Sequence, residues 1–122
     1  VNPGLDCPTG PVFRAFDAKG GGQGFGALEA LPPFQNVSDL INWLQGQGND
    51  LQAPAVELVP EIAIVLDTLA QLEGARLTRM SGSGATCFAL FESRQAAEAA
   101  ATVLAAARPG WWVRATLLGD AA

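Results

Sequence analysis

The sequence contains no histidine and only one lysine, Lys19. Because histidine is the commonest general base and a frequent metal ligand, its absence excludes a histidine-based catalytic centre and argues against zinc. The six arginines are scattered, and twelve acidic residues bring the net charge to -5. A chain of this charge lacks the electrostatic footprint of a protein that binds nucleic acid or an anionic membrane. We therefore expect no metal site, no nucleic acid and no membrane among its partners.

Cysteine is also scarce, with Cys7 and Cys87 far apart in the chain. They form no C-x-x-C motif, so the sequence predicts neither a metal knuckle nor a redox motif. Two free thiols are favoured over a disulfide.

Long apolar runs are missing as well. The longest, AAATVLAAA at residues 99–107, is too short to cross a bilayer, and the chain does not open on a secretory signal, so we expect a cytoplasmic protein. The 122 residues, 49% of them hydrophobic, are enough for a single domain (1–122) with one core. The chain starts without Met on VNPG, an apolar start followed by turn residues, which predicts the tail of a strand in a fragment of a longer protein.

What the sequence does contain is an alternation of helical and strand patterns. Its order of strand, helices, strand, strand, helix and strand predicts an α+β fold, a ferredoxin-like split βαβ sandwich with helices layered on an antiparallel sheet. After the strand tail in VNPG, the expected elements are a helix capped by Thr9, a short helix starting at Ser38, two helical pieces within 49–74, strands at 75–80 and 86–91, a helix capped by Ser93 and stopped by Pro109, and a last strand at 111–118.

Two glycine-rich segments invite a comparison with nucleotide-binding loops. GGGQGFG at residues 20–26 has a short helical pattern before it and ALEALPPF after it, whereas a dinucleotide fingerprint follows a strand and opens a helix. A flexible loop is therefore the favoured interpretation of this segment.

The second segment, SGSGAT at residues 81–86, lies between the two central strand patterns. Gly82 and Gly84 permit positive φ, successive N–H groups can form an anion nest, and the hydroxyls of Ser81, Ser83 and Thr86 add donors. The segment carries no lysine, and composition alone favours a plain hairpin turn over a phosphate-binding surface. The residues by themselves leave both interpretations open.

The acidic residues give a weaker signal. Pairs such as Asp50 with Glu57 have no nucleophile or cationic motif nearby, so solvated helix faces are favoured over an acid–base site. Asn49 and Asp50 precede a helical pattern and fit the role of helix cap.

Several segments together carry a resemblance to a known family. RMSGSGATCFALF (79–91), an alanine-rich helix and PGWWV (109–113) are preceded by VNPG, PTGPVFRAF (8–16), NDLQAPA (49–55) and PEI (60–62). In this order and spacing the chain resembles the C-terminal domain of the 4-diphosphocytidyl-2-C-methyl-D-erythritol kinases. These enzymes belong to the galactokinase, homoserine kinase, mevalonate kinase and phosphomevalonate kinase (GHMP) superfamily. The resemblance covers most of the chain except the stretch near residues 18–34.

The resemblance implies a kinase that uses ATP and Mg²⁺ to phosphorylate the 2-hydroxyl of 4-diphosphocytidyl-2-C-methyl-D-erythritol, in the non-mevalonate route to isoprenoid precursors. It places a glycine-rich turn of the superfamily, beside the phosphate-binding loop at the domain junction, at Ser81, Gly82, Ser83, Gly84, Ala85 and Thr86. With it, the anion nest becomes the favoured interpretation of this loop. The family-like NDL context also makes Asn49 and Asp50 candidate substrate contacts.

The resemblance also implies what this chain lacks. The catalytic Lys and Asp of these kinases, and the motif that wraps the ATP phosphates, belong to an N-terminal domain that nothing in the 122 residues matches. We therefore expect no catalytic residue in this chain, no ATP or Mg²⁺ bound by it alone, and no kinase turnover without the missing domain. We also expect an apolar face near residues 80–86 that drives self-association.

Two other functions stay open from the sequence. One is a free-standing ferredoxin-like module that binds a small metabolite without chemistry. The other is a dimerisation module that pairs through its last strand and an exposed tryptophan.

Overall fold

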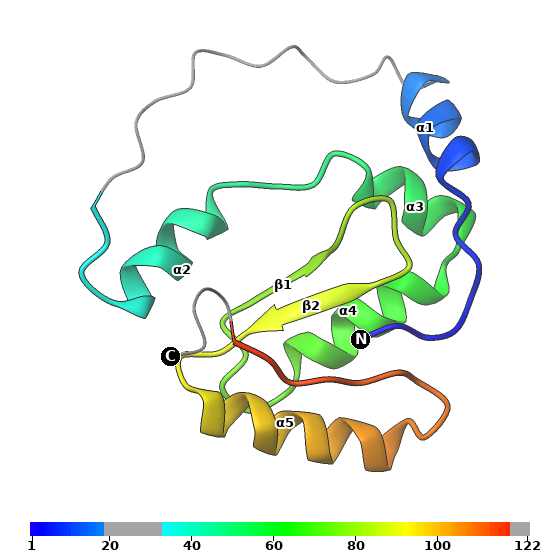
Figure 1. Cartoon of the computed structure of the whole chain (residues 1–122). Helices are drawn as coiled ribbons and strands as arrows, with labels where there is room; N and C mark the ends of the chain where they lie inside the picture. The colour runs from blue at the N-terminus through cyan, green and yellow to red at the C-terminus, as the bar shows by residue number, and fades with distance from the viewer. Residues whose placement is uncertain (19–32, 118–122) are drawn as a thin grey trace.

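A β-hairpin lies at the centre of the fold (Figure 1). In this computed structural model, which describes residues 1–18 and 33–117, β1 (Leu77–Met80) pairs antiparallel with β2 (Cys87–Leu90). Leu77 lies opposite Leu90, and Met80 lies opposite Cys87. Both central strands are thus confirmed, each shorter than predicted. The glycine-rich segment 20–26 lies outside the described residues.

The first two residues of the chain extend this sheet. Val1 and Cys87 exchange two backbone hydrogen bonds, each of 2.8 Å. Asn2 and Trp112 likewise exchange two, of 2.9 and 2.8 Å. Because residues that exchange both bonds form an antiparallel pair, the order across the sheet is β1, β2, residues 1–2 and Trp112. This is the order of a split βαβ sheet, and the predicted α+β fold class is confirmed.

The last strand, predicted over 111–118, is wrong in extent. Within its described part, only Trp112 forms a bridge, to Asn2. The pairing stops on one side because Pro3 has no N–H to donate and Gly4, with φ of +80°, turns the chain away. On the other side, residues 113–117 run past Val1 with no strand opposite them in the described part of the chain.

Helices cover the sheet and its loop end (Figure 1). α4 (Glu61–Ala70) contacts both strands, and α5 (Arg94–Ala107) lies beside α4. α1 (Thr9–Ala18) packs against α3 (Gln52–Leu58) at the end of the hairpin that carries the loop 81–86. All these elements contribute to one core, whose buried residues are Val12, Ala55, Ile62, Val65, Leu69, Met80, Ala85, Cys87 and Leu104.

The helix starts confirm one predicted cap, correct another and move one predicted start by a residue. Ser93 caps α5, since its hydroxyl accepts a hydrogen bond of 3.1 Å from the Ala96 N–H. α2 (Val37–Gln45) begins one residue before the predicted start at Ser38, and its cap is Asn36, which is extended and whose Oδ1 accepts from the Asp39 N–H at 2.9 Å. α1 begins at Thr9 itself, and the Thr9 hydroxyl bonds to another part of the molecule.

Candidate functional site

The loop 81–86 is a tight turn closed by its own backbone. The Ser81 N–H donates to the Thr86 carbonyl at 2.8 Å, and the Gly84 N–H donates to the Ser81 carbonyl at 3.1 Å. Gly82 and Gly84 have φ of +57° and +92°, the region that favours glycine. The predicted positive φ at both glycines is therefore confirmed.

The two glycines have different surroundings. A Cβ on Gly84 would lie 3.0 Å from the Met80 sulfur, 3.1 Å from the Cys7 sulfur and 3.3 Å from the Ile62 Cδ1. A Cβ on Gly82 would meet nothing within 4 Å. Gly84 thus lets the loop pack tightly onto the core, whereas Gly82 faces open space.

The beginning of the chain folds against this loop. The Asn2 side-chain amide donates to the Thr86 hydroxyl at 3.0 Å, and the Cys7 thiol donates to the Ser83 carbonyl at 3.2 Å. The Thr9 and Ser83 hydroxyls are hydrogen-bonded to each other at 3.0 Å. These contacts bring the N-terminal end of α1 beside the loop. The sequence did not predict these contacts. Its one indication was the polar segment at residues 8–10, where Thr9 was expected to cap a helix.

Asn49 holds the loop from the other side. Its side-chain N–H groups donate to the carbonyls of Met80 and Gly82, at 2.9 and 2.7 Å. Its Oδ1 accepts from the Leu51 N–H at 3.0 Å. The predicted helix cap at Asn49 or Asp50 is wrong, because α3 has Leu51 at its N-cap position without a side-chain cap. The side chain of Asn49 is used instead to fix where β1 ends and the loop begins.

Asp50 does not share this role. It is exposed, and within residues 1–18 and 33–117 the structure gives it no hydrogen bond. Of the two residues predicted together, the fold brings only Asn49 to the loop.

Hydrogen-bond donors remain available around the loop. None of the described residues accepts a hydrogen bond from the backbone N–H of Gly82, Ser83 or Ala85. The first N–H groups of α1 have no intrahelical partner, and the helix dipole adds partial positive charge at that end. The Arg14 guanidinium folds back onto this turn, 3.3 Å from where a Cβ on Gly10 would lie. Donors and positive charge together suit an anion such as phosphate.

The described part of this region offers no thiolate and no set of metal ligands. Both cysteines are free, as predicted. Burial raises the pKa of the Cys87 thiol to about 11 and also raises the pKa of the Cys7 thiol, so both are protonated at neutral pH. Across the described ranges, no group of three or more His, Cys, Asp or Glu side chains could hold a metal ion. The chemistry of the described groups is therefore that of hydrogen-bond donors, which suit an anion, and not that of an activated thiol or a metal centre.

Membrane insertion through a helix finds no support in the part of the chain that the structure describes. None of the helices there combines the length and the apolar character needed to span a bilayer.

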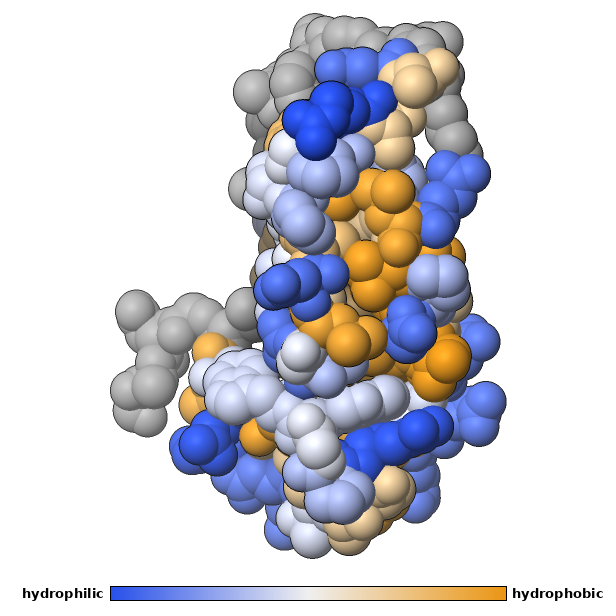
Figure 2. Space-filling view, turned by 90° about the vertical axis from the view of Figure 1, so that its right-hand side faces the viewer, coloured by the Kyte–Doolittle hydropathy of each residue, from blue (hydrophilic) through white to orange (hydrophobic). Residues whose placement is uncertain are grey.

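The apolar face expected near the loop is partly visible. Figure 2 shows hydrophobic surface on the side of the molecule that carries α1 and α3. Leu5 in the segment before α1, Phe13 of α1 and Leu58 of α3 are between 42% and 46% exposed. Whether this surface mediates self-association stays a prediction.

Fold and loop define a class: an α+β domain of the ferredoxin-like kind, with a donor-rich turn at the tip of its central hairpin. The family model of the GHMP kinases C terminal region matches residues 27–109. The chain belongs to this family of GHMP kinase C-terminal domains.

Comparison with individual proteins agrees with this family assignment. The chain is 51% identical over 123 residues to the 4-diphosphocytidyl-2-C-methyl-D-erythritol kinase of Hyphomonas neptunium, covering 99% of this chain and 41% of the relative. It is 49% identical over 119 residues to the enzyme of the same name from Methylobacterium radiotolerans, with 97% and 41% covered. A crystal structure of 4-(cytidine 5'-diphospho)-2C-methyl-D-erythritol kinase superposes with a TM-score of 0.62 at 31% identity, over 94% of this chain and 39% of that one. The chain thus spans about two fifths of the length of these relatives.

Proposed function

We propose that this chain is the C-terminal part of an ATP-dependent kinase that phosphorylates the 2-hydroxyl of 4-diphosphocytidyl-2-C-methyl-D-erythritol, in the non-mevalonate route to isoprenoid precursors. The observation that carries the proposal is the 51% identity to the Hyphomonas neptunium kinase along nearly the whole chain. The donor-rich loop 81–86 supports it, because a kinase must hold phosphate groups in place.

The chain's own contribution is to bind and orient. We assign the N–H groups of Gly82 and Ser83, which have no acceptor among the described residues, and the start of α1 as the donors to a phosphate oxygen. Fixed donors stabilise negative charge without reorganising during the reaction, which is how phosphoryl transfer is chiefly accelerated. ATP, when bound, supplies the phosphoryl group.

Asn49 acts in this scheme as a positioning residue. By donating to the carbonyls of Met80 and Gly82, it occupies these two acceptors and holds the beginning of the loop in place. Asp50, exposed beside it, has no part in holding the loop.

The remaining groups of the reaction come from a domain outside this chain. Among the described residues no group of three or more His, Cys, Asp or Glu side chains could hold a metal ion, and the N–H donors of the loop suit phosphate and not Mg²⁺, which prefers carboxylate oxygens. We propose that an N-terminal domain provides the base and the Mg²⁺ site, that the small-molecule substrate binds between the two domains, and that the enzyme works in the cytoplasm.

A chimera tests the proposal directly. In it, residues 1–122 replace the corresponding part of the Hyphomonas neptunium kinase, and ATP-dependent phosphorylation of 4-diphosphocytidyl-2-C-methyl-D-erythritol is measured. We expect turnover by the chimera and none by the 122-residue chain alone. A folded chimera without turnover, or turnover by the chain alone, would contradict the proposal.

A pair of glycine variants then tests the loop. Gly82→Val places a β-branched side chain at φ of +57°, which distorts the turn, and we expect kcat/KM to fall at least tenfold. Gly48→Val is the matched control, because Gly48 is also exposed with open space around it but does not have a positive φ. If the two variants had equal kcat/KM and circular dichroism showed both to be folded, the loop would not be part of the site.

A further inference from the structure

The segment 111–117 forms one edge of the sheet. Trp112 exchanges two backbone hydrogen bonds with Asn2, of 2.8 and 2.9 Å, so its N–H and its carbonyl both point toward that residue. Because backbone groups alternate in direction along an extended chain, those of Val113 and Ala115 point to the outer side. No residue within 1–18 or 33–117 forms a hydrogen bond with these outward groups. In the described part of the chain, the outer side is therefore an unpaired strand edge.

The opposite edge of the sheet, at β1, is covered by side chains. Gln45 donates to the Arg76 carbonyl at 3.0 Å, and the Gln52 Oε1 accepts from the Met80 N–H at 3.1 Å. Proteins protect an exposed edge with proline, lysine or other charges. The segment WWVRATL at 111–117 has no proline and no lysine, and its one charge is an arginine. This edge is thus open to pairing with another strand.

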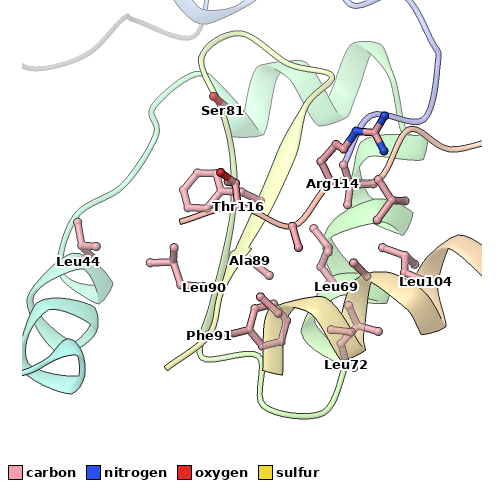
Figure 3. Close-up of a pocket in the computed structure, with 17 residues that line it drawn as sticks. Leu44, Leu69, Leu72, Ser81, Ala89, Leu90, Phe91, Leu104, Arg114 and Thr116 are labelled. Atoms are coloured by element: carbon pink, nitrogen blue, oxygen red, sulfur yellow. The ribbon is translucent and has the colours of Figure 1, made fainter. Parts of the chain in front are cut away.

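Trp112 and Arg114 lie on the same face of this edge. Val113 packs against the core, so its two neighbours point away from it. Figure 3 shows the Arg114 side chain directed away from Leu69 and Leu104, which line a cavity of about 490 Å³ on the core side of the segment. The guanidinium carbon of Arg114 lies 6.0 Å from the centre of the Trp112 ring, and Trp112 is 55% exposed. A cation and an exposed aromatic ring therefore lie side by side on the outer face.

We propose that two copies of this chain pair through segment 111–117, antiparallel and about a two-fold axis at Val113, so that their sheets join into one. Val113 then exchanges both backbone hydrogen bonds with the partner's Val113. The Ala115 N–H donates to the carbonyl of the partner's Trp111. The N–H of Trp111 is not needed for the pairing, because it already donates to the Arg108 carbonyl at 3.0 Å. Each copy uses the same surface, as a two-fold axis requires.

The sequence around Val113 is complementary to itself in this register, which is the reason for choosing a second copy as the occupant. Trp112 lies directly opposite the partner's Arg114, and Arg114 lies opposite the partner's Trp112. Side chains directly opposite each other have Cβ atoms about 4.5–5.5 Å apart, which lets a guanidinium group stack on an indole ring. The two arginines are diagonal neighbours, roughly 7–8 Å apart, so their repulsion is weaker than that of charges directly opposite each other.

Other registers lose this match. An axis at Arg114 would set two guanidinium groups directly opposite each other, which destabilises a sheet. An axis at Trp112 would set Arg114 against Gly110, which lies in the turn after α5. An axis at Ala115 would set Arg114 against Thr116 and leave Trp112 without a cation from the partner. The axis at Val113 alone among these four pairs each ring with a cation.

The interface is small, since residues 111–115 of each copy make most of the contacts. Interfaces that bury less than about 1,200 Å² in total are typical of weak and transient complexes. We therefore expect a dimer that dissociates on dilution. Strand pairing does not depend on phosphoryl transfer, so it is tested on the chain itself, independently of the proposed kinase function.

Two proline variants separate the outer side of the edge from the rest of the segment. Ala115→Pro removes an outward N–H that is bonded only in the dimer, and an edge strand tolerates proline where the N–H faces solvent. Thr116→Pro is the matched control, because the next N–H along the chain points inward and takes no part in the pairing. Sedimentation equilibrium from roughly 10 µM to 1 mM protein gives the dissociation constant of each form. Circular dichroism shows whether each variant is folded.

Two substitutions of Arg114 test the contact with the ring. Arg114→Glu sets a carboxylate over the indole ring of the partner's Trp112 and removes the attraction, whereas Arg114→Lys keeps a cation there. We expect the mass of the parent chain to rise from one copy toward two with concentration. The dissociation constant should increase at least about tenfold for Ala115→Pro and Arg114→Glu, and stay within about threefold for Thr116→Pro and Arg114→Lys.

Three results would overturn the proposal. One is a folded parent chain that stays monomeric over the whole concentration range. Another is a dimer that both Ala115→Pro and Arg114→Glu leave intact, because that dimer would use another surface. The third is equal weakening by the two proline variants, because damage to the segment as a whole, and not loss of the outer edge, would then be the cause.

Discussion

Replacing Asn49 with alanine removes the clamp that joins the end of β1 to the loop. The side chain makes three hydrogen bonds, to the carbonyls of Met80 and Gly82 and from the N–H of Leu51. Alanine makes none of them, and it leaves the partly buried Met80 carbonyl without its side-chain donor. The variant therefore tests whether Asn49 is needed to hold the loop.

The size of the effect follows from these bonds. Each hydrogen bond contributes about 0.5–1.5 kcal/mol, and solvent can replace the more exposed one to Gly82. We expect Asn49→Ala to lower the free energy of unfolding by about 2 kcal/mol. Near neutral pH, Asn49→Asp should lower the free energy of unfolding by at least as much, because a carboxylate oxygen would then face the two carbonyl oxygens of Met80 and Gly82.

Urea unfolding of the 122-residue chain, followed by circular dichroism, measures both variants. Asp50→Ala is the matched control, since this neighbouring side chain is exposed, and its variant should stay within about 0.5 kcal/mol of the parent. If the Asn49→Ala and Asp50→Ala variants were equally stable, the hydrogen bonds of Asn49 would not stabilise the fold, and Asn49 would not be needed to position the loop.

Four further perturbations have defined outcomes. Gly84→Ala should destabilise the chain by about 2–4 kcal/mol, because the new Cβ crowds two sulfur atoms at a positive φ. Gly82→Ala, whose new Cβ meets open space, should lower the free energy of unfolding by only about 1 kcal/mol. Equal urea midpoints for the Gly82→Ala and Gly84→Ala variants would argue against the tight packing of Gly84 onto the core. Ser93→Ala should lower stability by about 1 kcal/mol through loss of the α5 cap, an effect that Ser93→Asp should largely avoid. Raising the pH should also destabilise the chain, because an unfolded thiol ionises near 9.0 whereas buried Cys87 keeps its proton until about 11. The stability that this thiol contributes below pH 9.0 is thus lost progressively up to about pH 11, by at most roughly 3 kcal/mol. A Cys87→Ala variant that loses as much stability over the same pH range would contradict this cause.

Sequence alone determined those features that depend on neighbouring residues. The helical spacing of Ile62, Val65, Leu66 and Leu69 predicts the core face of α4, and the structure buries all of them except Leu66, which is half-buried. The apolar pattern on each side of SGSGAT predicted the hairpin, and Ser93 predicted the start of α5. Each of these follows from local periodicity, capping or turn chemistry, which a linear sequence displays. The family-like order of segments carried the prediction of a kinase C-terminal domain.

Only the tertiary structure decided how the loop is held and where the sheet is open. The partners of the loop lie at the start of the chain and at Asn49, between 31 and 84 positions away from the residues they contact. By residue type Asn49 suits a helix cap as well as a contact to the loop, and the fold decides between the two because it brings the carbonyls of Met80 and Gly82 to its side chain. The extent of the last strand, predicted over 111–118, likewise depends on which backbone lies beside it, and within the described residues only Asn2 pairs with it. Hydrogen bonds between distant segments are set by how the chain folds back on itself, and local sequence patterns do not record that.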